Sequence, residues 1–128
     1  ALSLVGSEMC IRDSFKSNGA YNHIEKYVQK EIEVSCTQLK TFCKENNIDH
    51  VDLIWMDLQG AELIALESMG KELLSTVQVI HTELETTPIY KDQCLYSDVH
   101  QFLKNNGMYR AEGNSSLAFG QNFIFVRK

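Results

Sequence analysis

The strongest constraint on the fold is a strand–helix–strand pattern between residues 51 and 80. Val51 to Met56 (VDLIWM) is short, almost uniformly apolar and bounded by polar residues, which is typical of a strand covered on both faces. Residues 61–74 then repeat apolar side chains at helical spacing, and residues 77–80 form a second apolar run. Such a unit predicts two parallel strands joined by a right-handed crossover, and therefore an α/β fold.

The crossover helix is expected over residues 61–74, with one apolar side. Gly70 interrupts it, and because glycine costs up to about 1 kcal/mol inside a helix, we expect a kink or an early end there. The side chains expected to face inward are Leu63, Ile64, Leu66, Met69, Leu73 and Leu74.

A helix and a hairpin are predicted after the crossover unit. The helix is expected to start at Ser97 and to close through Gly107 in a left-handed cap. Residues 108–111 and 121–127 flank a glycine- and serine-rich loop, which predicts an antiparallel hairpin. The inward residues of the helix are expected to be Val99, Phe102 and Leu103.

Three elements are predicted before the crossover unit. Residues 21–30 are expected to form a short helix, and residues 31–35 alternate as a half-exposed strand would. Thr37 can cap a further helix that runs to about Asn46. The apolar face of the first helix would carry Ile24, Tyr27 and Val28, and the inward side of the second Leu39, Phe42 and Cys43.

The composition indicates a soluble cytoplasmic protein. The formal net charge of −5 argues against general affinity for nucleic acid or for anionic lipid. No apolar run approaches the roughly 20 residues that span a bilayer. No pair among the four cysteines has the spacing of a zinc or redox site, which favours free thiols in a reducing compartment. These cysteines are Cys10, Cys36, Cys43 and Cys94.

The first fourteen residues, ALSLVGSEMCIRDS, do not fit the rest of the chain. Their continuous apolar stretch is too short for a secretory signal. Leu4 to Ser14 resembles instead the translation of a transposase adapter used to prepare sequencing libraries. We therefore expect a non-native segment at residues 1–14 and a partial domain at residues 15–128. The alternative is a natural amphipathic start.

Two acidic residues follow the predicted parallel strands. Asp57 ends the first strand and Glu83 ends the second. Ligands of open α/β sheets bind at the carboxyl ends of the strands, and neighbouring strands lie about 5 Å apart, so the two carboxylates are expected to line one crevice. Gly60 permits a tight exit from strand to helix, and Glu62 falls in the first helical turn.

Each of these residues also has a purely structural interpretation. Asp57 could only cap the helix that follows it, and Glu62 could only complement the helix dipole. His81 lies on the same strand face as Glu83, and a single histidine is more often structural. Glu83 is harder to explain structurally than the others, because it follows four apolar positions and lies far from any helix start.

These motifs together resemble the FkbM family of methyltransferases. VDLIWMDLQGAELIALESM (Val51 to Met69) resembles the family's hallmark, an apolar strand that leads into Asp-x-Glu-Gly-x-Glu and a leucine-bearing helix. The likeness covers about Val34 to Lys128 through VSCTQLKTF, VIHTELE, YSDVHQFLKNNGM and NFIFVRK. One departure is Gln59, where the family commonly has glutamate, so any role of a second carboxylate there is in doubt.

The resemblance implies the carboxyl-terminal half of a Rossmann-like methyltransferase sheet. It implies methyl transfer from S-adenosylmethionine to a hydroxyl, often of a sugar or small molecule. By the same resemblance, Asp57 would lie near the reacting methyl group as a base or an orienting acceptor, and Glu83 would help to position the acceptor hydroxyl. Some O-methyltransferases hold Mg²⁺ at the Asp57 position, but two carboxylates are a thin ligand set. The residues expected beside substrate or cofactor are Gln59, Gly60, Glu62, His81 and Glu85.

The family's glycine-rich cofactor loop has no counterpart in this chain, which contains no G-x-G-x-x-G. We therefore expect this chain alone to bind S-adenosylmethionine weakly or not at all, and to be inactive by itself. The strand of residues 51–56 would then be an exposed apolar edge. The alternative function is a non-catalytic module that binds a partner through this edge.

Overall fold

The computed structural model describes residues 35–89, 92–111 and 121–128. The helix predicted over residues 21–30, nearly all of the strand predicted over residues 31–35 and the segment 1–14 lie outside these ranges. The elements within them are α1 (Leu39–Glu45), β1 (Leu53–Met56), α2 (Glu62–Ser68), α3 (Gly70–Leu74), β2 (Val79–Leu84), α4 (Tyr96–Asn105), β3 (Met108–Arg110) and β4 (Gln121–Arg127).

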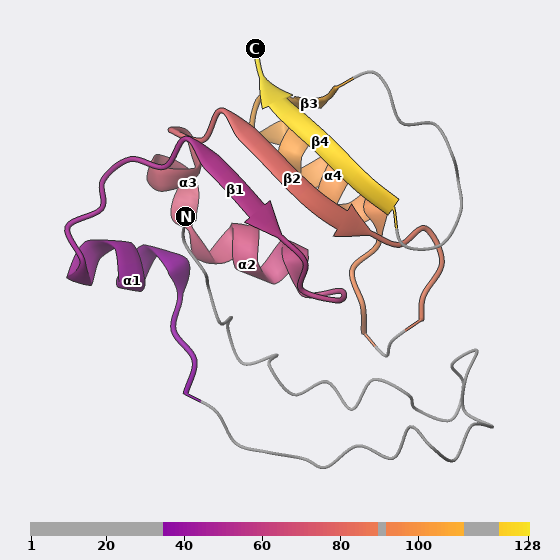
Figure 1. The fold of residues 1–128 in the computed structure, drawn as a ribbon, viewed down its shortest axis with the longest axis horizontal. Coiled ribbons are helices and arrows are strands. Elements are labelled where there is room, and N and C mark those ends of the chain that lie inside the picture. Colours follow the sequence, from indigo (N-terminus) through magenta and orange to yellow (C-terminus); the bar gives the residue numbers. More distant parts are fainter. Residues whose placement is uncertain (1–34, 90–91, 112–120) are drawn as a thin grey trace.

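The strands of the described ranges form one mixed sheet in the order β1-β2-β4-β3 (Figure 1). β1 runs parallel to β2, with Leu53 opposite Val79. β4 runs antiparallel to both of its neighbours, β2 and β3. The parallel strand–helix–strand unit and the terminal hairpin are thus confirmed, whereas the place of β4 between β2 and β3 had not been predicted.

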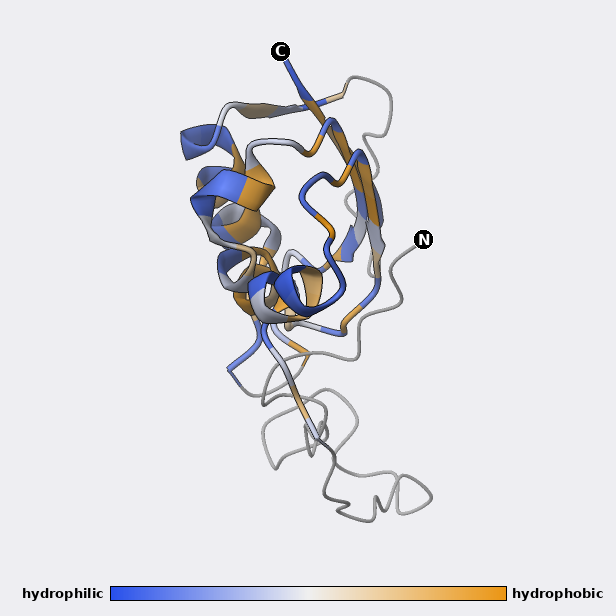
Figure 2. Ribbon diagram, turned by 90° about the vertical axis from the view of Figure 1, so that its left-hand side faces the viewer, coloured by the Kyte–Doolittle hydropathy of each residue, from blue (hydrophilic) through white to orange (hydrophobic). Residues whose placement is uncertain are grey.

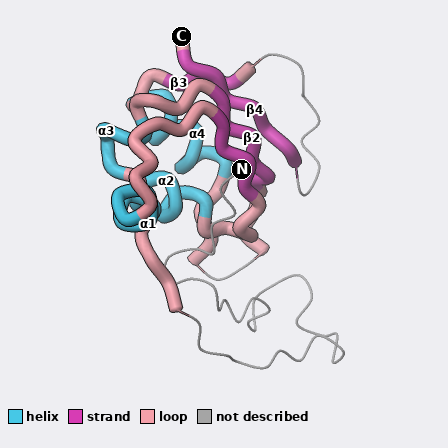
Figure 3. The backbone as a smooth tube through the Cα atoms, turned by 60° about the vertical axis from the view of Figure 1, so that its left-hand side comes forward, coloured by secondary structure: helices cyan, strands magenta, loops and turns pink. Residues whose placement is uncertain are grey.

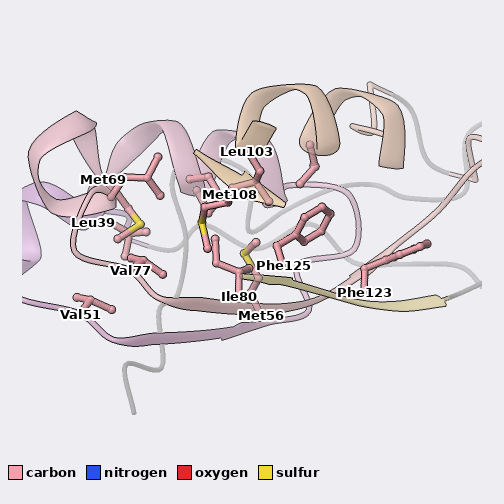
Figure 4. Close-up of a cluster of buried hydrophobic side chains, with 14 of the residues drawn as sticks. Leu39, Val51, Met56, Met69, Val77, Ile80, Leu103, Met108, Phe123 and Phe125 are labelled. Atoms are coloured by element: carbon pink, nitrogen blue, oxygen red, sulfur yellow. The ribbon is translucent and has the colours of Figure 1, made fainter. Parts of the chain in front are cut away.

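The described helices all lie on one face of the sheet, as Figures 2 and 3 show from two sides. The burial of β2 alternates strictly along the strand, with Ile80, Thr82 and Leu84 buried toward the helices. The apolar core fills the space between helices and strands (Figure 4). Its members without any exposed surface are Val77, Ile80, Val99, Leu103, Met108 and Phe125.

The predicted crossover helix is broken into two pieces at Gly70. Met69 ends α2 and precedes α3, and Gly70 has a φ of +72°, a conformation that glycine adopts without steric cost. The break confirms the expected interruption. The prediction that Ile64 faces inward was wrong, because its side chain is 40% exposed while its neighbours Ala65 and Leu66 are buried.

The prediction that the first strand is covered on both faces was wrong for the described part of the chain. Leu53 and Trp55 are 55% and 72% exposed, and Met56 is buried on the other side. A run of apolar residues indicates that burial of both strand faces would be favourable, but it does not provide the helix or strand that would bury them. The expected apolar edge is confirmed, since β1 ends the strand order.

The helix starts differ from the predicted ones by one or two residues. α1 begins at Leu39 after Gln38, so Thr37 is not its cap; the Leu39 N–H is satisfied instead by the Ser68 hydroxyl at 3.1 Å. α4 begins at Tyr96, and the Asp98 carboxylate accepts the N–H of Leu95 at 2.9 Å. The predicted left-handed cap is confirmed, with Gly107 at φ +76°.

Arg127, the last residue of β4, forms hydrogen bonds to three other segments of the chain. Its guanidinium donates to the carbonyl oxygens of Val77 at 2.8 Å, Asn106 at 2.8 Å and Leu74 at 2.7 Å. Leu74 ends α3 and Asn106 caps the end of α4. One partly buried cation therefore satisfies carbonyl groups at two helix ends, where backbone acceptors lack partners within the helix.

The helices of the described ranges are all too short or too polar to cross a bilayer. Cys43 and Cys94 are free thiols. Cys10 lies outside the described residues.

Candidate active site

A small open pocket lies where β1 and β2 end, at the carboxyl edge of the parallel pair. Its empty volume is about 220 Å³. The lining includes every residue that the sequence placed beside substrate or cofactor except His81, and adds Gln93 from the segment before α4. The lining residues are Asp57, Gln59, Gly60, Glu62, Glu83, Glu85 and Gln93.

Asp57 and Glu83 face each other across this pocket because of the strand register. Met56 is opposite Thr82 in the parallel pair, so the next residue of each chain segment meets its counterpart. The two carboxyl groups lie close enough for Asp57 to influence the protonation of Glu83. Glu83 does not end its strand as predicted; β2 continues to Leu84, and Glu83 lies inside it, paired with Asn122 of β4.

The surroundings of Glu83 favour its protonated form. Burial of the carboxyl group raises its pKa, and the negative charge of Asp57 raises the pKa further. Glu85 and Glu62 add smaller contributions of the same sign. A carboxylate with a raised pKa is a stronger base than an ordinary surface glutamate.

The turn from Asp57 to Gly60 has an unusual backbone. Gln59 and Gly60 have φ values of +52° and +100°, two successive residues in a region that favours glycine. The side-chain amide of Gln59 donates to the Asp57 carboxylate at 2.6 Å. A Cβ atom at position 60 would lie 2.4 Å from Cγ of Gln93, so only glycine fits between the turn and this side chain.

Glu62 lies in the first turn of α2, as predicted, and its carboxylate is buried. It is 1% exposed, and its Oε1 accepts the N–H of Leu58 at 2.9 Å and of Gly60 at 3.3 Å. Its Oε2 accepts a hydrogen bond from the thiol of Cys94 at 3.4 Å. Its contacts are therefore with the preceding turn and with the segment before α4.

His81 lies away from the pocket lining, on the sheet face opposite the helices. Its ring packs against Trp55 with the ring centroids 4.5 Å apart. Its Nδ1 is buried and has no hydrogen-bond partner among the described residues. The sheet strands also carry four large exposed side chains, Leu53, Trp55, Tyr109 and Ile124. We call these residues, together with His81, the open face.

Gln93 is the pocket residue that the sequence did not indicate. Its side-chain oxygen accepts the N–H of Ile89 at 2.8 Å, which fixes the loop before α4. The neighbouring Cys94 N–H donates to the Gly60 carbonyl at 3.0 Å. No local pattern marks Gln93, because its place depends on contacts with a turn more than thirty residues earlier in the chain.

A model of the methyltransferase FkbM domain matches residues 9–110. The chain belongs to the FkbM methyltransferase family. The resemblance found in the sequence is thereby confirmed.

Among curated proteins, this FkbM domain is similar to 2-O-methyltransferase NoeI of Sinorhizobium fredii (strain NBRC 101917 / NGR234). The two are 36% identical over 76 residues, which cover 56% of this chain and 31% of NoeI. The matched part of the chain thus spans about a third of the length of that relative. No solved structure matches the chain.

The pocket residues fit some of the groups that an FkbM domain implies better than others. The pocket is open to solvent and does not enclose a small molecule. Its side chains are carboxyl and amide groups, which suit a hydroxyl rather than a whole nucleoside cofactor. Within residues 35–89, 92–111 and 121–128, no group of three or more His, Cys, Asp or Glu is placed to hold a metal ion.

Proposed function

We propose that this chain is the carboxyl-terminal part of an S-adenosylmethionine-dependent methyltransferase that methylates a hydroxyl group of a sugar or another small molecule. The observation that carries the proposal is that Asp57, from the family's hallmark segment, and Glu83, from the neighbouring parallel strand, line one pocket. The relative NoeI bears the name of a 2-O-methyltransferase, which supports an oxygen acceptor.

The two carboxyl groups would act on the acceptor hydroxyl. Methyl transfer to oxygen needs an in-line approach and a partly deprotonated hydroxyl, so positioning and one general base suffice. Glu83, whose pKa is raised, would accept the hydroxyl proton, and Asp57 would orient the same oxygen from β1. S-adenosylmethionine would supply an electrophilic methyl group when bound. The described residues fit the acceptor side of such a site and not its cofactor side.

The domain assignment is part of this proposal. Residues 15–128 would be a partial methyltransferase domain of Rossmann-like type, and residues 1–14 a non-native segment. The absence of G-x-G-x-x-G from the sequence and the 31% coverage of NoeI support this view. The chain alone would then bind S-adenosylmethionine weakly and be inactive. We place the parent enzyme in the cytoplasm. The alternative of a non-catalytic module is not favoured, because the match to the methyltransferase family covers residues 9–110.

The test is a methyl-transfer assay on the full reading frame recovered from the source gene. Labelled S-adenosylmethionine would be offered with a panel of free sugars, oligosaccharides and phenols. Asp57→Asn should lower turnover by about a hundredfold, because the acceptor oxygen would lose a group that orients it for in-line attack. Asp49→Asn, at an exposed position outside the pocket, is the matched control. Activity of Asp57→Asn within about threefold of the control would refute the role of Asp57.

A further inference from the structure

We propose that Glu62 is a positioning residue: its buried carboxylate holds the turn of residues 57–60 from the inside, and thereby fixes Asp57 at the pocket. The inference rests on the proposed function, because Asp57 needs a fixed direction only if it acts on an acceptor. It goes beyond that function in assigning a task to a carboxylate that does not need to touch substrate.

The first observation is the burial of a charged group in an otherwise apolar interior. Glu62 is 1% exposed and, with Thr82, makes up the buried polar residues of the described ranges. A buried carboxylate is costly unless hydrogen bonds compensate for its lost hydration. A residue that only complemented the helix dipole would do so from the surface. The burial of Glu62 therefore indicates a task inside the structure.

The second observation is the direction of its hydrogen bonds. Glu62 accepts the N–H groups of Leu58 and Gly60, which precede it by four and two residues, at 2.9 and 3.3 Å. These amides flank Gln59, the non-glycine residue of the turn with a positive φ. Such a conformation persists only when its surroundings hold it. The carboxylate supplies that hold, since two N–H groups of the turn converge on one of its oxygen atoms.

The third observation links the turn to the opposite wall of the pocket. Burial raises the pKa of the Cys94 thiol to about 11, so the thiol stays protonated at neutral pH and can donate to Glu62. The backbone N–H of Cys94 donates to the Gly60 carbonyl at 3.0 Å. Glu62 thus joins the segment of Gln93 to the turn of Asp57, and both segments line the pocket.

The direct test is an NMR measurement on the unaltered 128-residue chain. A through-hydrogen-bond coupling between the Leu58 amide and the Glu62 side-chain carboxyl carbon is expected, because this bond is short at 2.9 Å. Failure to observe it in a folded sample with assigned resonances would overturn the proposal. This measurement needs neither a substitution nor activity.

The variant test uses amide hydrogen exchange in Glu62→Gln. Charge-assisted hydrogen bonds are roughly twice as strong as neutral ones, so the Leu58 and Gly60 amides should exchange about tenfold faster. The amides of β2 should not change. Glu67→Gln, an exposed glutamate of the same helix, is the control. Equal exchange in the two variants, or acceleration that β2 shares, would refute a local hold on the turn.

In the enzyme made from the full reading frame, Glu62→Gln should lower kcat by about tenfold and change KM for S-adenosylmethionine by less than about twofold. Here kcat is calculated from the concentration of active sites, which is measured by titration. A purely structural role would lower the number of active sites and not kcat. If the unaltered enzyme transfers no methyl group, the proposed function fails, while the NMR results still decide whether Glu62 holds the turn.

Discussion

Replacing Arg127 by methionine would remove a charged side chain that reaches three backbone carbonyls and would keep most of its apolar length. The three hydrogen bonds measure 2.7 to 2.8 Å and come from one guanidinium. A hydrogen bond to a charged group contributes about 1.5–3 kcal/mol. The site is only partly buried, so water can reach some of the freed carbonyls, and we take about 1 kcal/mol for each bond. The expected loss is therefore about 3 kcal/mol.

Urea denaturation of the 128-residue chain at neutral pH measures this loss. Single domains have free energies of unfolding of about 5–15 kcal/mol, so Arg127→Met should shift the midpoint far to lower urea. Arg127→Lys keeps the charge and can satisfy fewer carbonyls, so its loss should be intermediate. Lys104→Met, at an exposed position of α4, is the control. A loss below about 1 kcal/mol for Arg127→Met would show that the three bonds do not stabilise the fold.

Two further predictions concern the pocket and the open face. The pKa of Glu83 is raised in the folded chain, so folding favours its protonated form. The stability that this side chain contributes is therefore complete below the ordinary carboxyl range and is lost as pH rises through the raised pKa. Glu83→Gln should therefore increase the free energy of unfolding at neutral pH and leave it unchanged below about pH 4, by urea denaturation at both; an equal effect at the two pH values would contradict this. Trp55→Lys should reduce self-association in light scattering, because it places a charge on an exposed apolar edge, at a cost of about 1 kcal/mol for its contact with His81. Unchanged association would show that the chains do not associate through β1.

The parts of the fold that depend on local pattern could be predicted from the sequence. The parallel pair β1 and β2 follows from two apolar runs with a helix between them. Asp57 and Glu83 line one pocket because they follow the matched pair Met56 and Thr82 in the parallel register. The break at Gly70 follows from the backbone preference of glycine.

The parts that depend on contacts distant in sequence could not be predicted. Gln93 enters the pocket only because the loop before α4 packs on Gly60. The partners of Glu62 lie upstream of its helix, whereas the pattern pointed to the helix itself. The hairpin signal gave the pairing of β3 with β4 but contained no information on which strand would border β2.

The position of β4 has a consequence for the order in which the chain can fold. β2 and β3 share no edge, and β4 joins them, with Val79 opposite Val126 across nearly fifty residues of sequence. Until residue 121 has left the ribosome, the nascent chain can form the β1–β2 unit but has no strand to connect it with β3. Closing such a long loop is slow compared with local pairing. Arg127 then secures the helix ends only in this last step, so the newly made chain gains much of its stability at once rather than by gradual accretion.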